Sequence, residues 1–362
     1  MKKIIACLSM VFALLLLVAC DRRPKLYVLN WEQYINHDVV EAFEKEFNVN
    51  VVLRDTTSNE SMYNKVLTRA EKYDIVIPSD YMIQRMYEED LLIKLDFEKL
   101  PNYQASAFDE KLQELRDGYF AGNQDYAVPY FWGTLGIMYN KNKAGVKNLV
   151  EANGWSVFFE RDLVPTNVSV GMYDSSRDAV AAAELYLGYD LNTTDANKLN
   201  EVENRLKNNF FSQWGNDNLK EAVAEQNLDI ALVYSGDYFD QLFLALESNV
   251  TPTFDMYVPR DYNNIWFDAM VIPTTSTQTD FAHAFINFFL DFDNALENAS
   301  YVGYCPTIKE VYEAMKEDEE LADAVLHPGY YPGDVVYGVV YQHLGEDVAN
   351  RMDQILTRAK IK

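Results

Sequence analysis

The stretch YDIVIPSDYMIQRMYEEDLL, residues 73–92, changes its hydrophobic periodicity in the middle. Residues 74–78 form a short apolar run, which is typical of a buried strand. From residue 80 onward apolar side chains recur at helical spacing, and Ser79 or Asp80 is suited to cap the N-terminus of that helix. The stretch therefore predicts a buried strand that runs directly into a helix.

The same order of strand and helix is found before and after this stretch. Strands are predicted at 25–31, 49–53, 168–173, 229–234 and 266–273, and helices at 38–47, within 58–72, within 174–189, at 238–246 and within 280–292. This alternation predicts an α/β fold with a mainly parallel sheet. In such sheets ligands bind at the carboxyl ends of the strands.

Two strand-like crossings, near 131–139 and 255–270, divide these elements into two lobes that are interleaved in the sequence. We assign residues 21–130 and 268–315 to lobe 1, residues 131–267 to lobe 2, and residues 316–362 to C-terminal helices that pack across the lobes. Each lobe is expected to be a mainly parallel sheet flanked by helices. Two lobes joined by extended crossings predict a cleft that closes around a ligand.

The N-terminus has the pattern of an export signal. Lys2 and Lys3 precede an apolar stretch that ends at residue 19, which is too short to span a membrane. The residues before Cys20 resemble the lipobox of bacterial lipoproteins, so we expect residues 1–19 to be removed and Cys20 to be lipidated. Two or more acyl chains would anchor the exported protein to the cell membrane. Cys305 would then be the last thiol, and no intrachain disulfide could form.

The charge balance restricts the class of partner. Removal of residues 1–19 leaves 29 basic and 56 acidic side chains, a formal net charge of −27. Such a surface repels nucleic acid and attracts cations. We therefore expect no nucleic-acid partner and favour a cationic ligand over an anionic one.

The sequence contains no recognised catalytic motif. It has no G-x-S-x-G, G-x-x-x-x-G-K-[ST], H-E-x-x-H, C-x-x-C or G-x-G-x-x-G pattern. Adjacent Tyr330 and Tyr331 raise the alternative of ferric-ion binding, but their turn-rich surroundings favour a packed loop. We therefore expect a protein that is not an enzyme and that has no cofactor or metal ion.

Aromatic and acidic side chains gather where the predicted strands end. They are Trp31, Glu32 and Tyr34; Ser79 and Tyr81; and Tyr234 and Asp237, while Trp266 and Asp268 lie on the second crossing. In an extended strand Trp266 and Asp268 share one face. Aromatic faces cover methylene groups and attract ammonium groups, and each buried ammonium group needs a carboxylate. These side chains therefore fit a linear polyamine.

Six segments of the chain resemble the spermidine/putrescine-binding proteins of bacterial polyamine ABC importers, in the same order. They are YVLNWEQYI (27–35), SNESMYNKVL (58–67), YDIVIPSDYMIQRM (73–86), VPYFWGTLGIMYN (128–140), NNIWFDAMVIP (263–273) and AFINFFLDFDNALENASYVGY (284–304). The resemblance implies a two-lobed periplasmic binding protein of type II. Such a protein captures spermidine or putrescine by lobe closure and delivers it to a membrane permease. We expect it to act as a monomer.

The resemblance also implies which residues contact the ligand. The positions that match the family pattern are Trp31, Tyr34, Ser79, Tyr81, Tyr234, Asp237, Trp266, Asp268 and Tyr304. The chain departs from the pattern at two places, where it has Asp174-Ser175-Ser176-Arg177-Asp178 in place of an acidic pair, and Glu32 in place of a small polar residue. Counting Asp178, Asp237, Asp268 and either Glu32 or Asp174 gives enough acids for three ammonium groups, which slightly favours spermidine over putrescine.

Two other functions use similar residues. Paired carboxylates among aromatic rings also describe a glycoside hydrolase, which needs two carboxyl groups at one scissile bond. An oligosaccharide-binding protein would stack sugar rings on the same aromatic side chains, although sugars do not need an acid for every few ligand atoms.

Overall fold

The computed structural model describes residues 23–69, 71–120 and 122–361, so the predicted signal segment and Cys20 lie outside it. The strands are β1 (Lys25–Trp31), β2 (Asn50–Thr56), β3 (Ile75–Val76), β4 (Ala127–Asn140), β5 (Val170–Tyr173), β6 (Gln213–Gly215), β7 (Ile230–Tyr234), β8 (Phe254–Tyr257), β9 (Tyr262–Val271), β10 (Cys305–Pro306) and β11 (Tyr337–Val339). The helices are α2 (His37–Phe47), α3 (Asn59–Thr68), α4 (Asp80–Glu88), α5 (Glu110–Tyr119), α6 (Val146–Asn153), α7 (Ser156–Phe159), α8 (Ser176–Leu187), α9 (Ala196–Lys207), α10 (Asn218–Ala224), α11 (Ser235–Glu247), α12 (Thr279–Phe288), α13 (Phe292–Val302), α14 (Lys309–Glu317), α15 (Ala322–Val325) and α16 (Glu346–Lys360). None of these helices is long and apolar enough to cross a membrane.

The strands form a mixed sheet in the order β2-β1-β3-β9-β4-β7-β5-β6. At one side β1 pairs in parallel with β2 and β3, and at the other β5 pairs in parallel with β6 and β7. The two central strands, β4 and β9, are antiparallel to each other and to their outer neighbours. The α/β fold is confirmed, and the parallel strands lie on both sides of an antiparallel centre.

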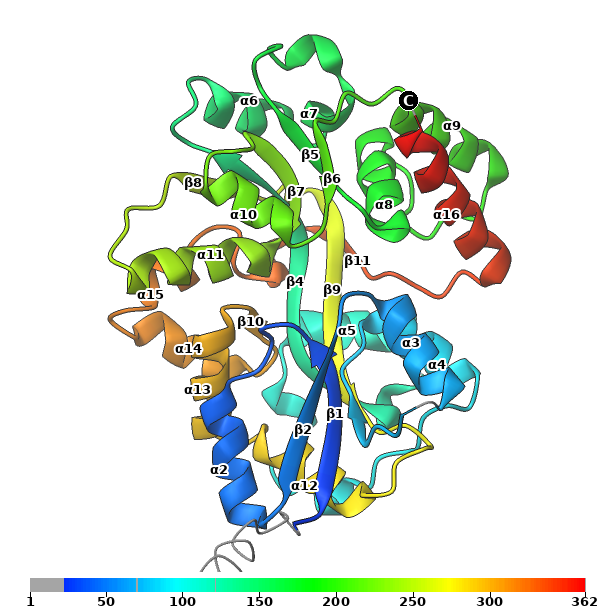
Figure 1. Ribbon diagram of the computed structural model, residues 1–362, viewed down its shortest axis with the longest axis vertical. Helices are drawn as coiled ribbons and strands as arrows, with labels where there is room; N and C mark the ends of the chain where they lie inside the picture. Colours follow the sequence, from blue (N-terminus) through cyan, green and yellow to red (C-terminus); the bar gives the residue numbers. More distant parts are fainter. Residues whose placement is uncertain (1–22, 70, 121, 362) are drawn as a thin grey trace, which may run out of the picture.

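Figure 1 shows how β4 and β9 connect two lobes. Lobe 1 contains β1, β2 and β3 with helices α2 to α5 and α12 to α14, and lobe 2 contains β5 to β8 with helices α6 to α11 and α16. The start of β4 pairs with the end of β9 in lobe 1, whereas residues 135–139 of β4 pair with β7 in lobe 2. The carboxyl ends of β1 and β3 therefore face those of β5 and β7 across the gap between the lobes.

The segment between β11 and α16 makes a further connection between the lobes. The backbone N–H of His343 donates to Oε1 of Gln84 in lobe 1 at 2.9 Å, and that of Gln342 donates to Oδ1 of Asn192 in lobe 2 at 2.8 Å. Helix α16 then contacts α8 and α9. Residues 316–362 thus include one segment bonded to both lobes and one helix on lobe 2.

The local sequence explains the bounds of α8 and the start of α11, two helices that border the gap between the lobes. Helix α8 begins after Ser175, whose side chain accepts the N–H of Asp178, and it ends at Gly188 in the left-handed conformation. Helix α11 begins at Ser235, three residues earlier than predicted, because the carboxylate of Asp237 accepts the backbone N–H of Tyr234 at 3.0 Å and stabilises the first turn.

Candidate functional site

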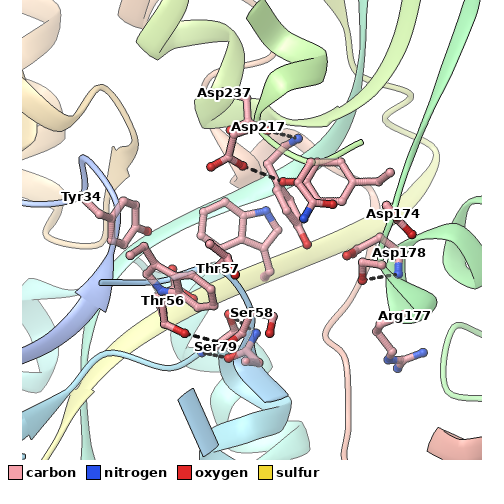
Figure 2. Close-up of a pocket in the computed structure, with 18 of the residues that line it drawn as sticks. Tyr34, Thr56, Thr57, Ser58, Ser79, Asp174, Arg177, Asp178, Asp217 and Asp237 are labelled. Atoms are coloured by element: carbon pink, nitrogen blue, oxygen red, sulfur yellow. Dashed lines mark hydrogen bonds between the residues drawn. The ribbon is translucent and has the colours of Figure 1, made fainter. Parts of the chain in front are cut away.

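A cavity of about 380 Å³ lies between the lobes and is lined by residues from both. It brings together all twelve residues selected from the sequence: Trp31, Glu32, Tyr34, Ser79, Tyr81, Asp174, Asp178, Tyr234, Asp237, Trp266, Asp268 and Tyr304. These residues come from strand ends, from helix starts, from the middle of β9 and from the position before β10, and they are up to 273 positions apart (31 to 304) in the chain. Figure 2 shows part of this cavity, with Tyr34 and Ser79 from lobe 1 and Asp178 and Asp237 from lobe 2.

The strand ends of lobe 1 place the first group of residues. Strand β1 ends at Trp31, and the following turn, in which Gln33 has a positive φ of 52°, places Tyr34 in the cavity wall. The carbonyl oxygen of Tyr34 accepts hydrogen bonds from the Tyr130 hydroxyl at 3.0 Å and from Nδ2 of Asn30 at 3.2 Å. These bonds fix the turn, so the position of Tyr34 is set by the protein.

Five aromatic rings form a continuous row through the cavity. The ring centroids of Tyr34 and Tyr304 are 5.1 Å apart, those of Tyr304 and Trp266 5.6 Å, those of Trp266 and Tyr234 5.6 Å, and those of Tyr234 and Tyr173 5.2 Å. All four contacts are edge-to-face, an arrangement that stabilises aromatic pairs. The row offers an apolar wall that passes from lobe 1 into lobe 2.

Two glycines make room for this row. A Cβ atom on Gly133 of β4 would overlap the indole of Trp266 and would lie 2.7 Å from Oγ of Ser235. A Cβ atom on Gly236 of α11 would overlap the ring of Tyr304. The rings can therefore pack directly on the backbone only because these positions have no side chain.

Asp268 is a buried acid without a cationic partner among the described residues. It lies on β9 and forms an isolated antiparallel bridge with Ser79. Its Oδ1 has no hydrogen-bond partner within the described ranges, and neither does Nε1 of Trp31 or Trp266. Burial raises the pKa of Asp268 to about 7, although the nearby hydroxyls of Ser79 and Tyr34 act in the opposite direction. Buried polar atoms are normally paired, so this group is suited to a ligand cation.

Asp178 provides a second buried acid on the lobe 2 side. Its Oδ1 accepts the hydroxyl of Tyr341 at 3.2 Å, and its own backbone N–H is capped by Ser175. Burial raises its pKa, while the hydroxyls of Ser175 and Tyr234 and the charge of Arg177 oppose the rise. The guanidinium of Arg177 lies 4.1 Å from the centroid of the Tyr341 ring and donates to the Leu191 carbonyl at 2.7 Å, so it holds Tyr341 in place.

Asp237 is the third buried acid, and the protein satisfies its charge. Its Oδ1 accepts the Tyr304 hydroxyl at 3.0 Å and lies 3.5 Å from Nζ of Lys220, and its Oδ2 accepts the N–H of Tyr234 at 3.0 Å. Burial raises the pKa of Asp237 to about 6, and the ammonium group of Lys220 limits the rise.

Two other acids selected from the sequence lie at the margin of the cavity. Both carboxylate oxygens of Asp174 are bonded to Nζ of Lys360, at 2.7 and 2.6 Å. Glu32 is exposed to solvent on the turn after β1. Asp174 and Glu32 are thus either paired or solvated, unlike the buried acids Asp178 and Asp268.

Among the cavity-wall residues that were not selected from the sequence are Tyr173, Asp217, Lys220 and Tyr341. Tyr173 ends β5, so the rule that selected Tyr234 at the end of β7 could have found it. Lys220 and Tyr341 carry no local signal, because they reach the cavity through contacts with residues 17 and 163 positions away.

Tyr330 and Tyr331, which raised the alternative of ferric-ion binding, do not line the cavity. The Tyr330 hydroxyl donates to the Tyr304 carbonyl at 3.1 Å, and the Tyr331 hydroxyl donates to Oδ2 of Asp109 at 2.6 Å. Among the described residues, no three His, Cys, Asp or Glu side chains are grouped so that they could hold a metal ion.

Comparison of the sequence with known proteins shows which family and which relatives this chain resembles. Residues 38–328 match the family model described as bacterial extracellular solute-binding protein. The chain is 28% identical over 347 residues to the putrescine-binding periplasmic protein SpuD of Pseudomonas aeruginosa, covering 93% of this chain and 91% of the relative.

Two solved structures have the same fold over nearly the whole chain. One is a spermidine/putrescine ABC transporter substrate-binding protein of Streptococcus pneumoniae (TM-score 0.76, 29% identity, 93% of this chain and 99% of that chain). The other is a lipoprotein of Treponema pallidum (TM-score 0.76, 26% identity, 93% and 100%).

Proposed function

Because the chain belongs to the bacterial extracellular solute-binding protein family, we propose that it captures a linear polyamine in the cavity between its lobes. The lobes, formed by residues 21–130 with 268–315 and by residues 131–267, would close around spermidine or putrescine. The loaded protein would deliver the amine to the permease of an ABC importer. Relatives whose names include spermidine or putrescine support this ligand class.

The proposal rests mainly on Asp268 and on Trp266, which lies two residues before it on β9. The acid is buried, its Oδ1 has no partner among the described residues, and the indole of Trp266 lies in the row of aromatic rings. A primary ammonium group would supply the missing hydrogen bonds and charge, and the attached methylene groups would lie along the rings. Asp178 would receive the opposite end of the ligand.

A sugar ligand fits these features less well. Sugars stack on aromatic rings, but a neutral sugar would leave the buried charges of Asp178 and Asp268 uncompensated. Membership of a solute-binding family, and not of a hydrolase family, also argues against glycoside cleavage. The buried carboxylates and the family membership thus both favour polyamine binding over sugar binding or glycoside cleavage.

Native mass spectrometry of the freshly purified protein, followed by thermal shift assays, tests the proposal. We expect a bound mass equal to a polyamine, and a rise in melting temperature with putrescine or spermidine but not with maltose or cellobiose. A rise with sugars alone, or turnover of a chromogenic glycoside, would reject polyamine binding.

We also propose that the exported protein is a monomer anchored through lipid on Cys20. The relative from Treponema pallidum is itself a lipoprotein, which supports the anchor. Metabolic labelling with an alkyne fatty acid should tag the wild type and not Cys20→Ser, and light scattering of the soluble chain from residue 21 should give the mass of one chain. Equal labelling of both proteins would reject lipidation at Cys20, and a dimer mass would reject the monomer.

A further inference from the structure

A lysine of the protein itself occupies one acidic end of the cavity. Lys220 of α10 lies with its Nζ 3.0 Å from Oδ2 of Asp240 and 3.5 Å from Oδ1 of Asp237. All three side chains line the cavity, and the side chain of Lys220 is only 11% exposed. Figure 2 shows Asp237 at this end of the cavity, on the opposite side of the drawn side chains from Ser79.

The lysine remains charged in this position. Burial alone would lower the pKa of Lys220, but the carboxylates of Asp237 and Asp240 outweigh burial and raise it. The result is a buried ion pair in which the cation already belongs to the chain. A ligand ammonium group placed beside Asp237 would have to displace Lys220 or lie next to a like charge.

The other acids of the cavity differ in whether they can accept a cation. Both oxygens of Asp80 accept backbone N–H groups, from Tyr81 at 2.6 Å and from Phe267 at 3.3 Å, and Asp174 is bonded to Lys360. Asp217 is exposed to solvent, so water screens its charge. Asp178 and Asp268 remain as buried acids for which the described residues provide no direct ion pair.

We propose that Lys220 acts as a built-in ammonium group at the Asp237–Asp240 pair, and that the cleft therefore prefers a ligand with two amino groups over one with three. This inference rests on the proposed polyamine function and goes beyond it by assigning specificity to one residue. It replaces the slight preference for spermidine derived from counting acids, because that count included Asp237 and Asp174, which the protein neutralises internally.

Calorimetric titration with putrescine and spermidine provides the test. The wild type should bind putrescine about tenfold or more tightly than spermidine, because the third ammonium group meets Lys220. Lys220→Met should reduce this ratio by about tenfold or reverse it, since it frees Asp237 and Asp240 for the third ammonium group. Lys220→Arg keeps the charge and should keep the putrescine preference.

Two further variants separate this effect from a general loss of charge. Lys147→Met removes an exposed lysine whose ion pair among the described residues is with Glu151, outside the cavity wall, so its ratio should equal that of the wild type. Adding Asp237→Asn to Lys220→Met should reverse part of the gain in spermidine affinity.

Each outcome of these titrations bears on one of the two proposals. Equal or tighter spermidine binding by the wild type would overturn the role of Lys220 while leaving polyamine binding intact, and this result does not depend on folding of a variant. An unchanged ratio in folded Lys220→Met would also overturn it. Failure of the wild type to bind any amine would instead overturn the proposed function.

Discussion

The ring of Tyr304 packs directly on the backbone of Gly236, and its hydroxyl donates to the carboxylate of Asp237 one residue further on. Gly236 lies in the first turn of α11, in lobe 2, whereas Tyr304 follows α13 of lobe 1. The contact therefore joins a wall of the cavity to a buried acid across the two lobes. The Tyr304 ring can approach the backbone this closely only because Gly236 has no Cβ atom.

Gly236→Ala should weaken amine binding and destabilise the protein. The added methyl group would displace the Tyr304 ring, and overpacking of this kind typically costs about 1–3 kcal/mol. Gly118→Ala is the matched control, because a Cβ atom at that helical position meets nothing within 4 Å beyond the backbone of its own helix and its chain neighbours. Denaturant unfolding and calorimetry would measure both effects; equal stability and affinity for Gly236→Ala and the wild type would show that the Tyr304 contact is dispensable.

Tyr341→Phe should reduce affinity for a diamine and also lower the melting temperature. The change removes the hydroxyl that donates to Asp178 but keeps the ring under Arg177. A lost hydrogen bond to a charged group is worth about 1.5–3 kcal/mol. Tyr331→Phe also removes a hydroxyl that donates to an aspartate, Asp109, which does not line the cavity, so it should leave the titration curve unchanged. A Tyr341→Phe protein with wild-type affinity would remove Asp178 from the proposed ligand contacts.

Binding should release protons near neutral pH. The raised pKa of Asp268, about 7, means that the unliganded protein holds this carboxyl group partly protonated at pH 7. A bound ammonium group favours the ionised form, so binding should release about half a proton from Asp268 at pH 7. Affinity should accordingly fall as the pH drops from 8 to 6. Titration calorimetry in buffers of different ionisation enthalpy measures the release; proton uptake on binding at pH 7 would contradict the assignment.

The sequence predicted the parts of the site that local patterns determine. Strand β1 has the predicted bounds, Ser175 and Gly188 delimit α8, and all twelve selected residues line one cavity. For the residues at the ends of β1, β3 and β7 this worked because side chains at the carboxyl ends of parallel strands meet at one edge of a sheet. Aromatic and acidic residues at such ends can thus be selected without knowledge of their partners.

The sequence could not reveal which acids the protein itself neutralises, because the neutralising lysines are distant from these acids in the chain. Nothing near Asp174 in the sequence indicates that Lys360 neutralises it, and nothing near Asp237 indicates Lys220. Each pairing arises because a helix on another part of lobe 2 places a lysine beside the cavity. A count of acids from the sequence therefore overestimates the charge that is free for a ligand.

Calorimetric titration of putrescine into the wild type and into Asp268→Asn tests the central claim most directly. The substitution preserves shape and removes the charge, so it should cost about 2 kcal/mol or more of binding free energy with little change in unfolding temperature. Asp229→Asn is the control, since that buried carboxylate bonds Ser169 and Lys143 and lies outside the cavity wall. Equal putrescine affinity in Asp268→Asn and the wild type would contradict the account.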